Sequence, residues 1–186
     1  MIEMRKVIVL CLAVLNVIQH LDVNAQTGSD TIKLITYNVG NFGTAATSQC
    51  PLFNLNLKSA YLRTVIKYEK PDIIGMVKIN GSQQFCTDTI VRYVLDSLCN
   101  GCWGYGTYTN VSTYQKENML YFNTSKFGFA GSNVIYNADP NISDITLHKL
   151  FYKSPNLSST HDTVFLKIVL AHLQSGSGNT LAEERR

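Results

Sequence analysis

Residues 70–80 read KPDIIGMVKIN, and this stretch decides how the chain around it folds. Pro71 cannot continue a helix and disfavours helical geometry at the residue before it, so the amphipathic segment upstream must end at about residue 69. Residues 72–79 are mostly apolar, which predicts a short buried strand. The stretch therefore predicts a helix that stops, a tight connection and a strand that enters the core.

The segments upstream predict one strand and one helix. Residues 31–39 alternate and are rich in β-branched side chains, which is typical of a strand, and Gly40–Gly43 are expected to end it. Residues 55–69 place apolar side chains at helical spacing, with Lys58 on the outer side. The predicted inner side consists of Leu57, Tyr61, Leu62, Val65 and Ile66.

The segments downstream predict one more helix, over residues 87–98, and then a run of strands. The predicted strands are residues 104–108, 118–123, 127–129, 133–136, 145–152 and 163–173. Asn179 or Thr180 is expected to cap a further helix. The order β-α-β-α followed by strands favours an α/β sandwich with a largely antiparallel sheet and helices on one face.

The composition fits one exported domain. The chain has 186 residues, of which 45% are hydrophobic and 16% charged, which excludes a disordered protein. The net charge of +3 excludes a protein that coats nucleic acids through charge alone. In residues 1–25 a basic start precedes an apolar run (Val7–Ile18) and a small-residue cleavage site at Ala25, the pattern of a signal peptide.

The predicted mature domain is therefore residues 26–186. It is expected to be secreted or periplasmic and to have no membrane contact after cleavage. The alternative is that residues 1–25 form an uncleaved membrane anchor. Four cysteines remain in the mature domain: Cys50, Cys86, Cys99 and Cys102. Cys99 and Cys102 are expected to close a small structural disulfide loop, while a redox pair and half of a zinc site are the alternatives. Cys50 and Cys86 would form the second pair.

Three motifs, in this order and on these predicted strands, resemble the endonuclease/exonuclease/phosphatase superfamily of DNase I-like enzymes. They are Thr36–Val39 (TYNV) at the end of a strand, Lys70–Gly75 (KPDIIG), and Leu170–Leu173 (LAHL) on a long strand. The resemblance covers about residues 31–186. It implies that these residues form a truncated domain, the N-terminal half of a DNase I-like four-layer α/β sandwich.

The resemblance implies a chemistry as well as a fold. Members hydrolyse phosphodiesters or phosphomonoesters with a divalent metal, usually Mg²⁺, so Asn38 is expected at the metal site and His172 at the scissile phosphate, both as catalytic residues. An amide oxygen suits the Mg²⁺ shell, and a histidine at a strand end is a reasonable acid or base near neutral pH. Without the resemblance, Asn38 is better explained as a turn residue and His172 as a core histidine than as catalytic residues.

Two departures from the family pattern predict an inactive chain. Lys78 stands where the family carries its metal-binding Glu, and at about 4 Å and an effective dielectric of about 20 each unit charge pair is worth roughly 4 kcal/mol. Mg²⁺ binding is therefore expected to be weak, with Lys78 as a substitute cation; a plain strand-edge lysine is the alternative. The family's later motifs, Gly-Asp-x-Asn and Ser-Asp-His, are absent from the sequence.

A half-domain is also expected to leave the inner face of its sheet without a partner, which predicts self-association. The residues expected to face water in part are Ile35, Ile73, Met119, Tyr121, Leu166, Ile168 and Leu170.

The sequence thus predicts an exported fragment of a metal-dependent phosphoesterase, whose full-length relative hydrolyses phosphodiesters such as DNA or RNA. Two alternatives stay open. One is a catalytically dead binder of phosphate ligands or nucleic acid that uses Lys33, Lys78 and His172. The other is a structural exported α/β domain.

Overall fold

The computed structural model describes residues 31–42, 55–80, 85–109, 116–136, 144–155, 157–161 and 163–172. The leader predicted for residues 1–25, Cys50, the side chain of Cys86 and the helix predicted from Asn179 lie outside the described residues. All the elements below belong to the unit that begins at Ile32.

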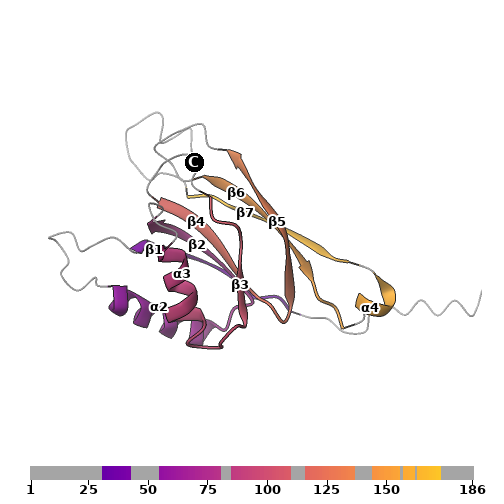
Figure 1. Ribbon diagram of the computed structural model, residues 1–186, viewed down its shortest axis with the longest axis horizontal. Helices are drawn as coiled ribbons and strands as arrows, with labels where there is room; N and C mark the ends of the chain where they lie inside the picture. Colours follow the sequence, from indigo (N-terminus) through magenta and orange to yellow (C-terminus); the bar gives the residue numbers. More distant parts are fainter. Residues whose placement is uncertain are drawn as a thin grey trace, which may run out of the picture. The chain divides into compact units, whose positions relative to one another are not determined.

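The described strands form two sheets, and the helices are few (Figure 1). The first sheet has the order β1 (Leu34–Phe42), β2 (Ile73–Asn80), β4 (Lys116–Asn123), β3 (Trp103–Tyr105). The second has the order β5 (Phe127–Tyr136), β6 (Ile145–Tyr152), β7 (Phe165–Leu170). The helical segments are α2 (Leu55–Glu69), α3 (Phe85–Ile90), the π-helical turn η1 (Val91–Leu95) and α4 (Leu157–Thr160). β1 and β2 pair in parallel and the other described pairs are antiparallel, so the predicted α/β class with a largely antiparallel sheet is confirmed.

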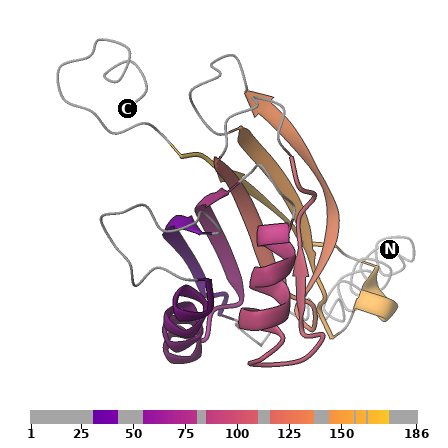
Figure 2. The same cartoon turned by 60° about the vertical axis from the view of Figure 1, so that its left-hand side comes forward.

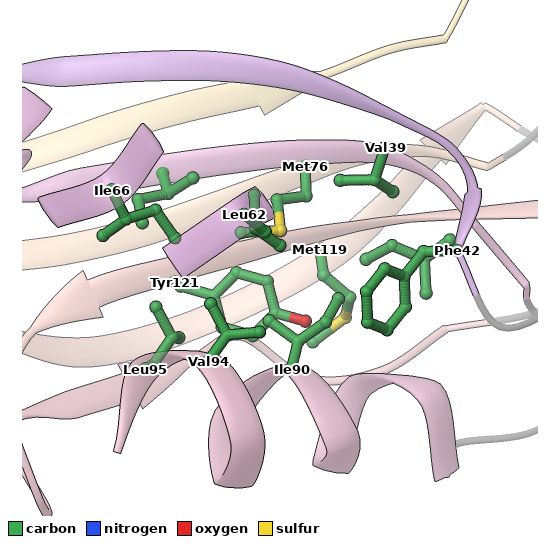
Figure 3. Packing of buried hydrophobic residues seen from close by; sticks show 12 residues of the cluster. Val39, Phe42, Leu62, Ile66, Met76, Ile90, Val94, Leu95, Met119 and Tyr121 are labelled. Carbon is green, nitrogen blue, oxygen red and sulfur yellow. The ribbon is translucent and has the colours of Figure 1, made fainter. Parts of the chain in front are cut away.

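Two apolar layers hold the elements together. The first lies between the β1–β4 sheet and the helices, where Leu62 of α2 and Val94 of η1 pack towards Met119 and Tyr121 of β4 (Figure 3). The second lies between the two sheets, and its buried members are Ile73, Leu120, Phe122, Phe127, Leu150 and Leu170. Each fully buried side chain of this kind contributes about 1.5–3 kcal/mol. Figure 2 shows α2 and α3 together on one side of the β1–β4 sheet.

Asp72 ties the start of β2 to two other parts of the chain. One carboxylate oxygen accepts a hydrogen bond from the Lys33 amide just before β1 (2.9 Å), and the other lies 3.1 Å from the Lys126 ammonium in the turn after β4. The Asp72 carbonyl accepts a further bond from the Asn123 amide (2.8 Å). Asp72 is only 9% exposed, so these contacts are shielded from water. The Pro-Asp motif thereby fixes how β1, β2 and β4 begin relative to one another.

The expectation of an open inner face is wrong for four of the seven residues named above. Ile73, Met119 and Tyr121 have no exposed surface, and Leu170 is 4% exposed. The reason is that the β5–β7 sheet folds back over β2 and β4, while the helices cover the opposite face. The other three, Ile35, Leu166 and Ile168, are half-buried as expected.

Exposed apolar side chains gather instead on and beside β7. Val164, Phe165 and Val169 are 61%, 47% and 54% exposed. The predicted self-association stays a prediction, because the structure describes one chain.

Several local predictions also need correction. β1 runs through Gly40 to Phe42, because Gly40 takes a left-handed φ of +57° and the buried Phe42 side chain anchors the strand end. Residues 127–136 form one strand rather than two, with Gly131 at the irregularity in its pairing. Tyr61 of α2 is 61% exposed rather than buried. β7 is shorter than the strand predicted over residues 163–173.

Cys99 and Cys102 are bonded, which confirms the predicted disulfide loop. The loop closes just after η1, and the Cys102 carbonyl accepts a hydrogen bond from the Thr124 amide (2.8 Å). The loop therefore links the end of the helical segment to the turn after β4. No helix in the described part of the chain is long and apolar enough to cross a membrane.

Replacing Asp72 should loosen the whole unit. We expect Asp72→Ala to lower the free energy of unfolding by about 2–3 kcal/mol, because it removes two side-chain hydrogen bonds and leaves the Lys33 amide and the Lys126 ammonium without this acceptor. Urea denaturation at pH 7 measures the change. Asp88→Ala, at an exposed aspartate of α3, is the matched control and should cost less than about 1 kcal/mol. Equal losses in the two variants would show that Asp72 has no special structural role.

Candidate functional site

Asn38 lies in the middle of β1, and Lys78 lies near the carboxyl end of β2. The two strands are parallel, and Asn38 pairs with Val77, the neighbour of Lys78. The Asn38 side chain is exposed, and its amide oxygen accepts a hydrogen bond from the Gly40 backbone amide (3.1 Å). Two of the three residues predicted for the site are thus neighbours.

Lys78 lies in a distorted part of β2. Met76 pairs with Met119, but Ile79 pairs with Glu117, so β2 carries one extra residue at this point, a β-bulge. Lys78 has a φ of +64°, a left-handed conformation that costs a non-glycine residue about 1–2 kcal/mol. Its side chain is half-buried. Strained backbone of this kind is enriched at functional sites, but Lys70 and His161 share it, so the strand-edge lysine remains the alternative.

His172 follows β7, whose last paired residue is Leu170, opposite Thr146 of β6. Leu170 lies against Gly75 of β2, three residues before Lys78. The Asp144 carbonyl, just before β6, accepts a hydrogen bond from the Asn118 side chain (3.0 Å), and Asn118 lies opposite the bulge that contains Lys78. His172 is half-buried and comes two residues after Leu170.

Glu117 of β4 is a candidate that the sequence prediction missed. It has no exposed surface, and neither carboxylate oxygen has a hydrogen-bond partner within the described residues. Burial raises the pKa of Glu117 from 4.5 to about 8, with the charge of Asp144 adding to the shift. The predicted strand began at Asn118, whereas β4 begins two residues earlier, at Lys116. The signal that was available is the charged pair Lys116 and Glu117, just before Asn118 and the apolar run 119–122.

His148, in the middle of β6, is a second buried polar group. It has no exposed surface, and its Nε2 lies 3.0 Å from the Thr146 hydroxyl. Burial lowers the pKa of His148 to about 4, so the ring is neutral at pH 7. The ring lies against Gly106, where a Cβ atom would come within 2.5 Å of Nδ1. Only glycine leaves room for the ring here.

Lys33 does not belong to this group. Its ammonium forms an ion pair with Glu69 (2.6 Å) just before the start of β1, and its amide binds Asp72. Lys33 precedes β1 and bonds Asp72 at the start of β2, whereas Lys78 lies near the carboxyl end of β2, so the structure does not bring Lys33 and Lys78 together.

The described residues at this site do not fit Mg²⁺. Mg²⁺ prefers carboxylate oxygens, but the residue that pairs with Asn38 is Val77, and the next residue along β2 is Lys78, so neither supplies a carboxylate. Within the ranges that the structure describes, no three His, Cys, Asp or Glu side chains gather in a way that could hold a metal ion. Chemically, the arrangement offers a cation, an amide and an imidazole, which are groups that bind anions.

Solved structures match the chain, although no family model and no curated protein does. An endonuclease/exonuclease/phosphatase family protein from Bacteroides thetaiotaomicron has 11% identity and a TM-score of 0.48, over 77% of this chain and 50% of that one. A mannosyl-6-phosphatase from the same species has 11% identity and a TM-score of 0.48, over 77% and 53%. A family protein from Bacteroides vulgatus has 13% identity and a TM-score of 0.45, over 76% and 52%.

The chain spans about half the length of these three structures. Structures of the endonuclease/exonuclease/phosphatase family are thus similar to it, as the three sequence motifs predicted.

The raised pKa of Glu117 should make the protein less stable at mildly alkaline pH. Between pH 4.5 and about 8, Glu117 is protonated in the folded state and deprotonated in the unfolded chain. The free energy of unfolding should therefore fall as the pH rises through this window. We expect Glu117→Gln to remove this pH dependence. At pH 8.5 the free energy of unfolding of the variant should exceed that of the wild type by about 2–4 kcal/mol. Urea denaturation from pH 7 to 9 measures it, a range in which His148 is neutral.

Glu69→Gln is the matched control for this experiment. Glu69 is part of a largely exposed ion pair with Lys33, so its neutralisation should leave the alkaline pH dependence as it is in the wild type. A wild-type protein whose stability does not change between pH 7 and 9 would contradict the raised pKa of Glu117.

Proposed function

We propose that the chain carries the phosphate-binding end of an exported phosphoesterase of the endonuclease/exonuclease/phosphatase superfamily, and that as it stands it binds phosphate esters without hydrolysing them. The observation that carries the proposal is the pairing of Asn38 with the strained segment of β2 that holds Lys78. Two of the sequence motifs support it, because TYNV carries Asn38 and LAHL carries His172; the third, KPDIIG, lies at the opposite end of β2, where Asp72 holds the strands together.

In this proposal each residue has a definite role towards the phosphate. The Lys78 ammonium pairs with a phosphate oxygen, and the Asn38 amide donates a hydrogen bond to another. His172, on the facing sheet, stabilises negative charge when its imidazole is protonated. Bound Mg²⁺ would polarise the phosphate in an active relative. In this chain the Lys78 ammonium supplies the positive charge that Mg²⁺ would supply, and it activates no water molecule.

The identity of residue 78 decides between cation and anion binding. A lysine in place of the expected carboxylate reverses the local charge, and each unit charge pair is worth roughly 4 kcal/mol at about 4 Å and an effective dielectric of about 20. A divalent cation is therefore disfavoured and a phosphate dianion favoured at the same position. We propose phosphodiesters such as DNA or RNA as substrates of an active relative with a glutamate here. The predicted leader at residues 1–25 supports a location outside the cytoplasm.

A purely structural domain is the rival function. Two observations weigh against it, namely the left-handed conformation of Lys78 and the buried carboxyl of Glu117. Both features lower stability, and a domain without a ligand gains nothing in return.

Reversing the charge at residue 78 tests the proposal. We expect inorganic phosphate to raise the thermal unfolding midpoint of the wild type and to lose this effect in Lys78→Glu, because the anion-binding cation is replaced by a carboxylate. We expect Mg²⁺ to stabilise Lys78→Glu and not the wild type. A ligand at 100 times its dissociation constant stabilises by about 2.7 kcal/mol, which thermal denaturation with and without each ion detects readily.

Lys67→Glu provides the matched charge reversal. Lys67 is exposed in the last turn of α2, so this variant should respond to phosphate and to Mg²⁺ as the wild type does. Identical responses of the wild type, Lys78→Glu and Lys67→Glu to both ions would leave the structural domain as the better description.

A further inference from the structure

The turn that follows Asn38 has a defined geometry. The Gly40 amide donates its hydrogen bond to the Asn38 side-chain oxygen, and Gly40 takes a φ of +57°, which favours glycine. Because that oxygen accepts a backbone N–H, the side-chain amide is held in one orientation, with its amino group as the end that can donate to a ligand. No atom comes within 4 Å of where a Gly40 Cβ would lie, so the turn has open space beside it.

Lys58 binds the carbonyl group of Gly40. It is the fourth residue of α2, and its ammonium donates a hydrogen bond to the Gly40 carbonyl (3.1 Å). The amide of Gly40 is thus held by Asn38 and its carbonyl by Lys58. The sequence prediction, which put Lys58 on the outer side of the helix, is wrong, because the side chain is half-buried and turns towards β1.

A lysine is a poor choice for this position on helical grounds alone. The first turn of a helix carries the positive end of its dipole, which disfavours a cation, and the first turn of α2 contains no acidic residue to offset it. Burial also disfavours the charge and lowers the pKa of Lys58. A residue that departs from helical preferences in this way is expected to make a contact outside the helix. The hydrogen bond to the Gly40 carbonyl is such a contact.

We propose that Lys58 is a positioning residue, which clamps the Asn38–Gly40 turn so that the Asn38 amino group faces the phosphate. The inference rests on the function proposed above for Asn38 and Lys78. It extends that function by adding a residue from α2 that the motifs do not include and that acts only through Asn38.

The test follows the Asn38 side-chain amide directly. We expect its NMR resonances to shift in Lys58→Met, because the turn is released, and to return towards the wild-type positions in Lys58→Arg, which keeps a donor of similar reach. The affinity for inorganic phosphate should fall about 5–10-fold in Lys58→Met, the loss expected when one well-oriented hydrogen bond is weakened, and should recover in Lys58→Arg to within about twofold of the wild type.

Lys67→Met is the control, because it removes an exposed lysine from the same helix. It should leave both the Asn38 resonances and the phosphate affinity unchanged. A purely structural role for Lys58 would lower the unfolding midpoint without moving the Asn38 amide resonances in the folded protein, and that result would overturn the inference. So would an unchanged phosphate affinity in a folded Lys58→Met protein.

The failure of the proposed function would look different. If phosphate bound to no variant, the wild type included, the phosphate proposal would be wrong. The response of the Asn38 resonances to Lys58→Met and Lys58→Arg would then still decide whether Lys58 clamps the turn.

Discussion

The carboxylate of Asp72 is the contact on which the arrangement of the sheet depends. Its two oxygens reach the backbone before β1 and the turn after β4, while its own residue begins β2. Near this contact Ile73 lies between Leu34 of β1 and Phe122 of β4. A slip of one residue would turn every side chain of a strand to the opposite face. The same register, followed to the far end of the strands, sets which polar residues become neighbours there.

The two ends of the unit differ in how well their polar groups are satisfied. At the Asp72 end, Lys33 pairs with Glu69 and Lys126 with Asp72. At the far end, Lys78 is strained, and the carboxylate of Glu117 has no hydrogen-bond partner within the described residues. Natural domains depart from good local structure mainly at functional sites. Left-handed backbone occurs at both ends, at Lys70 (φ +46°) beside Asp72 and at Lys78 (φ +64°), so the buried carboxyl of Glu117 is the feature that distinguishes the far end.

Local sequence patterns predicted the elements well where local physics decides them. The bounds of α2 and β6 match their predicted ranges, because Pro71 stops the helix and clear apolar patterns mark both segments. The patterns failed where distant contacts decide. Lys58 turns inward to reach the Gly40 carbonyl, and β1 continues to Phe42 because the core receives that side chain. Neither contact is visible in a helical or alternating pattern.

The candidate site was predictable to a similar extent. The motifs assigned Asn38 and position 78, on two separate predicted strands, to one site, and the structure pairs these strands in parallel with Asn38 opposite Val77. Glu117 and His148 were not predicted, because only their burial distinguishes them from other polar residues in strands. Their burial depends on how the second sheet folds over the first. A polar residue in a strand reads as water-facing until the stacking of the sheets is known.

The charges at the far end favour an anion over a metal ion. Lys78 supplies a positive charge, and Glu117 supplies no negative charge at neutral pH, because burial and Asp144 raise its pKa to about 8. The Asn38 oxygen, the natural ligand for a cation, is engaged by Gly40, which leaves the amino group of the amide to donate. Lys78 and Glu117 would have to change their charge to suit Mg²⁺, whereas a phosphate oxygen meets a positive charge at Lys78 and a donor at the Asn38 amide without any change. The substitution at position 78 and the turn at Gly40 therefore act in the same direction, towards phosphate binding.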